Sequence, residues 1–369
     1  MCGSLFSIYI SNAFCGKKWV DKLQNKVYNN SDGILLSLLY LTEVFMPIYL
    51  NESLRKENIS AVFCAVADHG CDTRSDISAH TGISVVTVGK AAEGFLDSGI
   101  FIQKESQKKT VGRHASRILL DRSKHLVIID ITSNNFEVSY FNLALERVYN
   151  YVHEYIDDFC YTDNLCAFLH RVKAHMLECK DNRYLATCMI VPGNYDKESD
   201  KVVNCDSPEL SKIRLQDHIR TKVGMSVNRI IDRTVAAVRH CQKLCIAGDN
   251  VLYLRLDSNE TLQSRIIVDG KVLKNLSGCG RTVSGDDVRL FVADFIADIC
   301  AVANIAQVYI EGNNRLYDED ANQIKTLLSD GRLLRDDRVP VVLVNSGIPF
   351  SHLGSASYLR SIWLDNFMR

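Results

Sequence analysis

The stretch Thr73–Gly99, TRSDISAHTGISVVTVGKAAEGFLDSG, contains two short helical segments separated by a tight turn. Thr73 can cap a first helix over 74–80, and Ser84 can cap a second that runs to about Leu96, because a hydroxyl at the N-cap accepts a bond from a free backbone amide. The turn is Thr81-Gly82-Ile83, in which glycine can take the left-handed conformation. Two short helices joined in this way are typical of a helix-turn-helix.

A packing helix is expected just before this pair. Between Asn58 and Asp68, apolar side chains recur at helical spacing, namely at Ile59, Val62, Phe63 and Val66. Gly70 then ends the helix. The second helix of a helix-turn-helix lies in the major groove, with its first residues near base edges. We therefore expect DNA contacts from Arg74, Ser84, Val85, Thr87 and Lys90. A threonine can bond a base edge or a phosphate, a valine can touch a thymine methyl, and a lysine suits phosphate.

A basic hairpin is expected next, with strands at Ile100–Ile102 and Ile118–Leu120. Its loop carries one acid, Glu105, against Lys104, Lys108, Lys109, Arg113 and Arg117. A basic loop by itself is usually a solvated surface. Directly after a helix-turn-helix it favours phosphate contact and minor-groove insertion, as in the wing of a winged helix. The residues expected to make these contacts are Lys108, Lys109, Arg113 and His114.

From Lys124 onward, strand-like apolar runs alternate with helical stretches, which predicts an α/β body with a largely parallel sheet. The expected strands are Leu126–Ile131, Phe136–Leu143, Tyr184–Val191, Val227–Ile231, Val251–Leu256, Ser264–Val268, Gln307–Ile310 and Pro340–Val344. The sequence thus predicts three parts: an N-terminal extension of unassigned role over 1–50, a winged helix-turn-helix over 51–122 and the α/β body over 123–369.

Composition adds mainly exclusions. The net charge of the 369 residues is -1, so any DNA-binding surface must be local. The 13 cysteines form no C-x-x-C pair, and the cluster His240, Cys241 and Cys245 lacks a second ligand pair, which favours buried free thiols over a metal site. The apolar segment 33–50 contains Glu43 and favours a buried or interface helix over a membrane span. No basic residue precedes the apolar start, so a cytoplasmic protein is expected.

The helix-turn-helix resembles that of regulators of the ROK family, which comprises repressors and sugar kinases built on one fold. Residues 75–88, SDISAHTGISVVTV, are similar to the family's S-R-x-x-L-A-x-x-T-G-L-S-x-x-T-V-S stretch, with some positions shifted or replaced. Gly112-Arg113-His114-Ala115 resembles its G-R-P-A wing motif. In the body, Val191-Pro192-Gly193 with Asp196 resembles V-P-G-x-x-D, residues 308–313 resemble V-V-L-G-G-G, and Gly354-Ser355-Ala356 resembles G-A-A.

The resemblance implies a two-lobed, sugar-kinase/actin-like (ribonuclease-H-like) body, but the kinase motifs depart from the family's pattern. Kinases begin the body with D-I-G-G-T, whose glycines let backbone amides approach ATP phosphates. Here Asp130-Ile131-Thr132-Ser133-Asn134 has no glycine. The second phosphate loop, G-T-G-I-G, corresponds to 257–261, which has none either and carries two carboxylates that would repel a triphosphate.

The catalytic and metal motifs are altered as well. The family's N-D-A-N stretch corresponds to Ile231-Asp232-Arg233-Thr234, so Asp232 falls on the position of the general base. An aspartate after an apolar strand is also a common helix N-cap, and Arg233 could pair with it locally. The sugar- and zinc-binding segment E-x-G-H would fall near 278–300, where residues 278–287 hold no histidine and one cysteine. Zinc and other cofactors are therefore not expected.

The resemblance implies a DNA-binding regulator, a repressor of carbohydrate-related genes and not an enzyme. It would bind an operator as a homodimer, and Asp232 and Gly193 would mark the inherited cleft for a sugar or sugar-phosphate effector. Two alternatives stay open. One is an ATP-dependent sugar kinase that uses Asp232 as base. The other is an interaction protein that has lost DNA binding, because Val85 and Gly89 replace polar residues of the recognition helix and a glycine weakens a helix by about 1 kcal/mol.

Overall fold

The computed structural model describes most of the chain from residue 46 onward. The described residues are 46–105, 116–131, 136–156, 158–178, 183–205, 207–244, 250–256, 261–268, 271–273, 281–282, 287–311, 318–329, 341–344 and 347–369. The expected extension up to residue 45 and the wing residues Lys108, Lys109, Arg113 and His114 lie outside these ranges. The same is true of residues 132–134 and 257–260 in the two glycine-free phosphate-loop counterparts, and of 278–280 and 283–286 in the segment compared with the zinc loop.

The chain divides into two units. The first comprises Met1–Phe95 and Ser106–Arg117, and the second comprises Leu96–Glu105 and Ile118–Arg369. The division separates the three N-terminal helices from the α/β part, as the domain prediction does, but it assigns the strands of the expected wing mainly to the second unit. The boundaries 51–122 and 123–369 stay a prediction.

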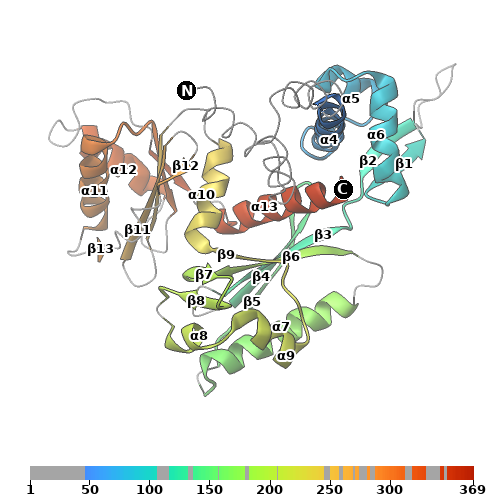
Figure 1. The fold of residues 1–369 in the computed structure, drawn as a ribbon. Coiled ribbons are helices and arrows are strands. Elements are labelled where there is room, and N and C mark those ends of the chain that lie inside the picture. Colours follow the sequence, from blue (N-terminus) through green and yellow to red (C-terminus); the bar gives the residue numbers. More distant parts are fainter. Residues whose placement is uncertain are drawn as a thin grey trace, which may run out of the picture. The chain divides into compact units, whose positions relative to one another are not determined.

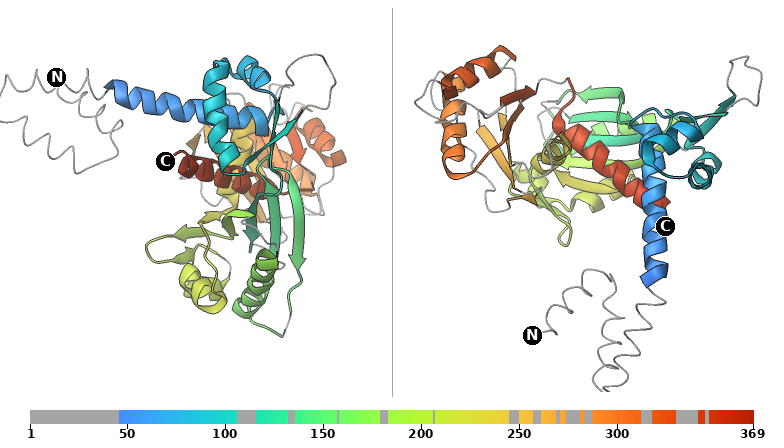
Figure 2. Two further views of the ribbon diagram at one scale, coloured as in Figure 1. Left: turned by 90° about the vertical axis from the view of Figure 1, so that its right-hand side faces the viewer. Right: turned by 90° about the horizontal axis from the view of Figure 1, so that it is seen from above.

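Three helices form the described core of the first unit. They are α4 (Met46–Ala67), α5 (Arg74–Thr81) and α6 (Val85–Asp97). Figure 2 shows α5 and α6 beside the C-terminal end of α4. Their apolar residues Phe63, Ile77, Val88 and Phe95 are fully buried, and the rings of Phe63 and Phe95 lie 5.5 Å apart. Ala79, two positions after the buried Ile77, is exposed, because it lies on the opposite side of the short α5.

The strands of the expected wing occur as β1 (Phe101–Glu105) and β2 (Ser116–Leu120), which form a two-stranded sheet. Ile100, Phe101 and Ile118 are buried at its base. The hairpin loop between the strands is not described.

The first lobe of the second unit is a five-stranded sheet. Its strands are β3 (His125–Asp130), β4 (Phe136–Asn142), β5 (Arg147–His153), β6 (Tyr184–Val191) and β9 (Arg229–Asp232), in the order β5-β4-β3-β6-β9. The pairs β3–β4 and β4–β5 are antiparallel, whereas β3–β6 and β6–β9 are parallel. Strand β5 was not among the expected strands, because Tyr149 and Tyr151 alternate with Val and Asn instead of with charged residues.

Helices cover both faces of this sheet (Figure 1). One face packs on α7 (Tyr161–Glu178), α8 (Pro208–Lys212) and α9 (Leu215–Val223), through a core that includes Phe136, Phe168 and Ile219. A small hairpin, β7 (Asn194–Asp196) and β8 (Lys201–Val203), follows β6 on this side. The other face carries α13 (Phe350–Phe367), the last helix of the chain.

The second lobe contains the strands β10 (Val251–Leu256), β11 (Thr261–Val268), β12 (Lys271–Val272), β13 (Arg281–Thr282), β14 (Gln307–Glu311) and β15 (Val341–Val344). Their order is β12-β11-β10-β14-β15, with β13 paired to β11, and β10, β14 and β15 are parallel. Helices α11 (Val288–Val302) and α12 (Asp318–Ser329) pack on one face. Residues of α10 (Arg233–Leu244) and Phe350 at the start of α13 pack on the other.

The close crossing of α10 and α13 explains the Gly354-Ser355-Ala356 motif. A Cβ atom added at Gly354 would lie 1.8 Å from the carbonyl oxygen of Ala236, so only glycine fits where the two backbones meet. The motif therefore serves helix packing.

The cysteines of the described ranges are free thiols. Nowhere in those ranges do three or more histidine, cysteine or acidic side chains converge as metal ligands would. Among the described helices, none has the length and hydropathy that a membrane span requires.

Candidate functional site

The α5–α6 turn is held by local hydrogen bonds from side chains that the sequence singled out. The amide of Asp76 donates to Thr73 Oγ1 at 3.1 Å, and the amide of Thr87 donates to Ser84 Oγ at 3.2 Å, so both expected N-caps are present. Gly82 ends α5 in the left-handed conformation, with φ at 73°. Ser78 Oγ donates to the carbonyl of Ile83 at 2.6 Å, which fixes the chain between the helices. The angle between α5 and α6 is therefore set by several short contacts.

The first two turns of α6 present a mixed surface. Ser84, Val85 and Lys90 are exposed, as expected for a helix that reads DNA, and Arg74 is exposed at the start of α5. Thr87 is half-buried, and its Oγ1 lies 2.9 Å from Ser84 Oγ. Each of these two hydroxyls thus has a partner within the cap. Thr87 is less available to a ligand than the sequence suggested.

Val86 belongs to this surface, although sequence reasoning did not single it out. Its side chain is 71% exposed, against 47% for Val85. An exposed valine at a helix start has no role in the core, and Val86 lies on the same exposed surface as Ser84 and Lys90. The helical period could have identified it, because Val88 and Ala92 define the buried side and Val86 lies away from both.

Gly89 lies beside the Arg74 side chain. It is buried, and a Cβ atom at this position would lie 3.7 Å from Nε and Cζ of Arg74, an ordinary van der Waals distance. The packing around α6 would therefore also accept alanine here, and it does not explain the glycine.

Arg117 is the described cation nearest to the wing loop on the β2 side. Its guanidinium donates to the Asp72 carboxylate, with Nε 2.8 Å from Oδ2. This ion pair fixes the start of β2 to the segment before α5. It also neutralises Arg117, so phosphate contacts by the wing would rest on residues outside the described ranges.

In the body, Asp232 caps a helix. Its Oδ1 accepts a hydrogen bond from the amide of Val235 at 2.9 Å, at the start of α10. Burial raises the pKa of Asp232, and the amides of Val235 and Thr234 only partly oppose this shift. The N-cap interpretation thus accounts for the residue, while a raised pKa at the end of β9 is also what a general base would have.

Asp130, the first residue of the D-I-G-G-T counterpart, lies in a buried polar cluster. It is 3% exposed, and its Oδ2 lies 3.0 Å from His352 Nε2 and 3.5 Å from Arg233 Nη2. Arg233, which the sequence suggested as a partner of Asp232, thus reaches Asp130. The other ring nitrogen of His352 lies 3.1 Å from Ser139 Oγ. The cluster joins β3, β4, α10 and α13 where a kinase would hold phosphate.

Glu311 stands at the first glycine of the V-V-L-G-G-G counterpart. Its carboxylate accepts a hydrogen bond from the Tyr253 hydroxyl and another, of 3.1 Å, from the amide of Phe350 at the start of α13. Burial, together with the Glu311 charge, raises the pKa of Tyr253 well above its usual range. The Glu311 carboxylate therefore bonds the free amide at the start of α13. A free amide at a helix start is a group that can otherwise bind a phosphate.

Comparisons with known proteins agree with this fold. No protein-family profile and no curated protein sequence matches the chain. A solved ROK family transcriptional regulator, a homolog of the E. coli Mlc protein, matches with a TM-score of 0.56 and 14% identity, covering 85% of this chain and 98% of that one. A ROK glucokinase from Streptomyces griseus with glucose and AMPPNP has a TM-score of 0.48 at 12% identity, over 64% of this chain and 99% of that one.

A ROK family protein from Streptococcus pneumoniae in complex with sucrose gives a TM-score of 0.47 at 10% identity, over 66% of this chain and 98% of that one. This chain has the ROK fold. The family resemblance seen in the sequence is confirmed at the level of the fold. The fold by itself does not decide between a regulator and a kinase.

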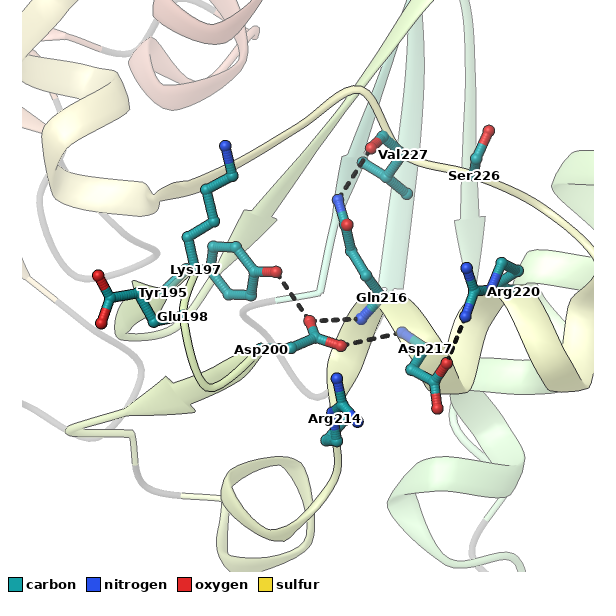
Figure 3. A pocket seen from close by; sticks show the side chains of 10 residues that line it. All are labelled: Tyr195, Lys197, Glu198, Asp200, Arg214, Gln216, Asp217, Arg220, Ser226 and Val227. Atoms are coloured by element: carbon teal, nitrogen blue, oxygen red, sulfur yellow. Dashed lines mark hydrogen bonds and ion pairs between the residues drawn. The ribbon is translucent and has the colours of Figure 1, made fainter.

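Gly193 of the V-P-G-x-x-D counterpart stands where the backbone leaves no room for a side chain. A Cβ atom there would lie 2.5 Å from the carbonyl oxygen of Val203, where the β7–β8 hairpin closes. The hairpin leads to a pocket of about 370 Å³ bordered by α9 (Figure 3). Neither of the two expected effector residues, Gly193 and Asp232, is among its lining residues.

The pocket has balanced charges. Its cations are Lys197, Arg214 and Arg220, and its acids are Glu198, Asp200 and Asp217. The Asp200 carboxylate accepts hydrogen bonds from the Tyr195 hydroxyl and from the amides of Gln216 and Asp217, which caps α9 (Figure 3). Arg220 donates to Asp217 at 2.7 Å. The Gln216 side-chain amide donates to the carbonyl of Val227 at 3.0 Å (Figure 3). Much of the polar lining is therefore paired within the protein.

Proposed function

We propose that this protein is a DNA-binding transcription regulator, a repressor of carbohydrate-related genes, whose ROK body serves dimerisation and effector sensing. The observation that carries the proposal is the surface of α6. Ser84, Val85, Val86 and Lys90 are exposed at the start of a helix whose angle to α5 is fixed by capping bonds. The first residues of such a helix are the ones that reach base edges in the major groove.

The share of this chain that matches the solved regulator supports the proposal. The match extends over 85% of this chain, whereas the body from Ile118 to Arg369 makes up about two-thirds of it. The likeness to a ROK regulator therefore extends beyond the body. A homodimer would place two recognition helices about one DNA turn apart, which suits a near-palindromic operator.

The state of the kinase motifs also supports a regulator. Phosphoryl transfer needs groups that hold the phosphates and neutralise their charge. Here Asp130 is engaged by His352 and Arg233, and Glu311 takes the first amide of α13. At both positions, where a kinase motif would contact its ligand, an acidic side chain is bonded within the protein instead.

Selection of DNA fragments tests the proposal. The purified protein is incubated with its own upstream DNA and with random sequence, and retained fragments are titrated at several salt concentrations. We expect a near-palindromic site. Val85→Ala should relax sequence specificity, because it removes an apolar contact to a base, and Arg113→Ala should weaken binding to all sequences and lower the salt slope by about 1, because it removes a phosphate contact. Failure to retain any fragment above non-specific background at low salt would refute DNA binding.

A sugar kinase that uses Asp232 as base is the second candidate, and the raised pKa of Asp232 at the end of β9 favours it. ATP consumption with common hexoses, measured for the wild type and for Asp232→Asn, decides the point. Turnover that disappears in Asp232→Asn would establish the kinase.

The effector is tested separately. An effector must favour one of two arrangements of the recognition helices in order to regulate. Calorimetry with a panel of sugars and sugar phosphates is expected to give heat, and the response should change in Arg214→Ala if the pocket beside α9 is the site. The absence of heat across the panel would remove effector sensing from the proposal and leave DNA binding untouched.

A further inference from the structure

Strand β5 and its flanks have a sequence that reads nearly the same in both directions. From Glu146 to Glu154 it is E-R-V-Y-N-Y-V-H-E, with Asn150 at the centre. The only asymmetric pair is Arg147 and His153. When a strand pairs antiparallel with a copy of itself, each residue faces its mirror position, so a palindromic strand places like beside like along its whole length.

Strand β5 also lies at the edge of its sheet (Figure 1). It pairs with β4 on one side, and within the described part of the chain no strand pairs with the other. Proteins usually protect such edges with lysine, proline or a covering segment. The strand contains no lysine, proline or glycine.

The strand is held firmly on its inner face. The Tyr149 ring stacks on His175 of α7 at a centroid distance of 4.6 Å, and Arg171 donates to the Tyr151 hydroxyl at 2.6 Å. The valines on either side of these tyrosines, Val148 and Val152, are each 45% exposed. A rigid edge with exposed β-branched side chains is suited to pairing with another strand.

We propose that β5 pairs antiparallel with β5 of a second copy of this chain, about a twofold axis at Asn150, so that two five-stranded sheets become one. In this register Tyr149 faces Tyr151 of the second copy, Val148 faces Val152, and Asn150 faces itself. Cross-strand pairs of aromatic and β-branched residues each stabilise a sheet by about 0.2–1 kcal/mol. The exposed side chains of Ile156 and Phe159 continue the apolar surface beyond the strand.

Charges do not oppose this pairing. Glu146 would face Glu154, but Arg122 donates to the Glu146 carboxylate at 2.7 Å and neutralises it. Arg147 lies 3.8 Å from Glu137 and donates to the carbonyl of Gly347, so it is compensated within its own chain. Burial lowers the pKa of His153, which disfavours a positive charge on the ring opposite Arg147.

A bulge defines where the regular ladder begins. Tyr140 pairs with Tyr149 and Phe141 pairs with Arg147, so Val148 is the extra residue on β5. A bulge bends its strand locally. Residues Tyr149–His153 remain regular, and they contain the proposed centre.

Pairing of β5 with a second copy does not depend on DNA binding. A twofold dimer would supply the two DNA-reading units that the proposed function needs, yet the same dimer could form in a protein that binds no DNA. A monomeric wild type would remove dimerisation from the proposed function as well, whereas DNA binding is tested separately by fragment selection.

Cysteine cross-linking tests the register. In the full chain with Cys160→Ser, which removes an exposed thiol, Asn150→Cys should form a disulfide-linked dimer under mild oxidation. Val152→Cys is the matched control on the same strand. In the proposed register it lies four residues from its own copy, about 13 Å along the strand, beyond disulfide reach. Asn150→Ser controls for the lost amide.

Light scattering gives the second readout. The wild type should be a dimer at micromolar concentration, and Val152→Lys should raise its dissociation constant at least tenfold, because it brings a charge into the paired edge. Val203→Lys, at a similarly exposed valine of β8, should leave the dimer unchanged. A monomeric wild type, a dimer that Val152→Lys does not weaken, or cross-linking of Val152→Cys as strong as that of Asn150→Cys would overturn the proposal.

Discussion

The α5–α6 surface and the kinase motifs of the body differ in where their polar groups find partners. Around the α5–α6 turn, hydroxyl groups satisfy backbone amides within a few residues, and the outer side chains Val85, Val86 and Lys90 are left to solvent. In the body, Asp130 and Glu311 find partners in distant segments, and both are withdrawn from any ligand. We expect a binding site to hold its structure through local hydrogen bonds and to leave its ligand-contacting side chains exposed. The predictions below test this difference.

The largest effect is expected inside the body, at Gly354. Gly354→Ala would bring a Cβ atom to 1.8 Å from the carbonyl oxygen of Ala236, so α10 and α13 must separate. We expect a loss of at least about 3 kcal/mol in the free energy of unfolding, at the upper end for overpacked cores. Chemical denaturation measures it. Gly89→Ala, where the added atom would have ordinary contact with Arg74, should cost far less.

The next effect concerns the exposed face of α6. Val86→Glu should weaken binding to a selected operator at least 100-fold, equivalent to about 2.7 kcal/mol, because it brings a negative charge to the phosphates. The melting temperature should hardly change, since the side chain is 71% exposed. Val203→Glu, on the body, is the control that should bind as the wild type. Unchanged binding by Val86→Glu would mean that α6 does not enter DNA.

The Asp130 cluster should matter for stability alone. Asp130→Asn weakens the bonds to His352 and Arg233 and leaves the Arg233 charge less compensated, which we expect to cost about 2 kcal/mol of unfolding free energy. Operator affinity, measured where the variant is fully folded, should stay within twofold. A variant that keeps its stability and gains or loses ATP binding would show that the cluster serves a ligand.

The smallest effect is expected at Asp232. Asparagine caps a helix about as well as aspartate, so Asp232→Asn should change the unfolding free energy by less than about 0.5 kcal/mol near neutral pH. Because the folded protein raises the pKa of Asp232, the wild type binds this proton more tightly when folded and gains stability as pH falls through the raised pKa. The variant lacks that gain. Denaturation at neutral and mildly acidic pH should therefore show the wild type improving relative to Asp232→Asn.

Local signals in the sequence predicted helices α5 and α6 and the turn between them. Thr73 and Ser84 act as caps and Gly82 takes the left-handed conformation, as the sequence indicated, because a cap and a turn depend on residues within four positions of each other. Val86 was missed because the expected contacts were chosen by residue type, whereas exposure depends on which side of α6 the core occupies. Lys108, Lys109, Arg113 and His114 stay predictions.

The sequence predicted the fold class of the body but not the contacts in its interior. Strand–helix alternation indicated an α/β fold, yet β5 was missed because its tyrosines and valines lack the alternation of a half-buried strand. We expected Arg233 to pair with Asp232 because the two are neighbours in the chain, whereas the fold brings Arg233 to Asp130. The roles of Gly193 and Gly354 as points of close backbone approach also needed the packed structure.

The sequence by itself determined the helix caps, the turn between α5 and α6, the strand–helix alternation of the body, and the absence of glycine from the counterparts of the phosphate loops. It did so because these features depend on neighbouring residues. Only the tertiary structure decided that Asp130 lies against His352, that Glu311 holds the start of α13, and that the palindromic β5 lies at a sheet edge. Those contacts join residues far apart in the chain, and they form because a buried charge needs a partner and an edge strand is defined by what packs beside it.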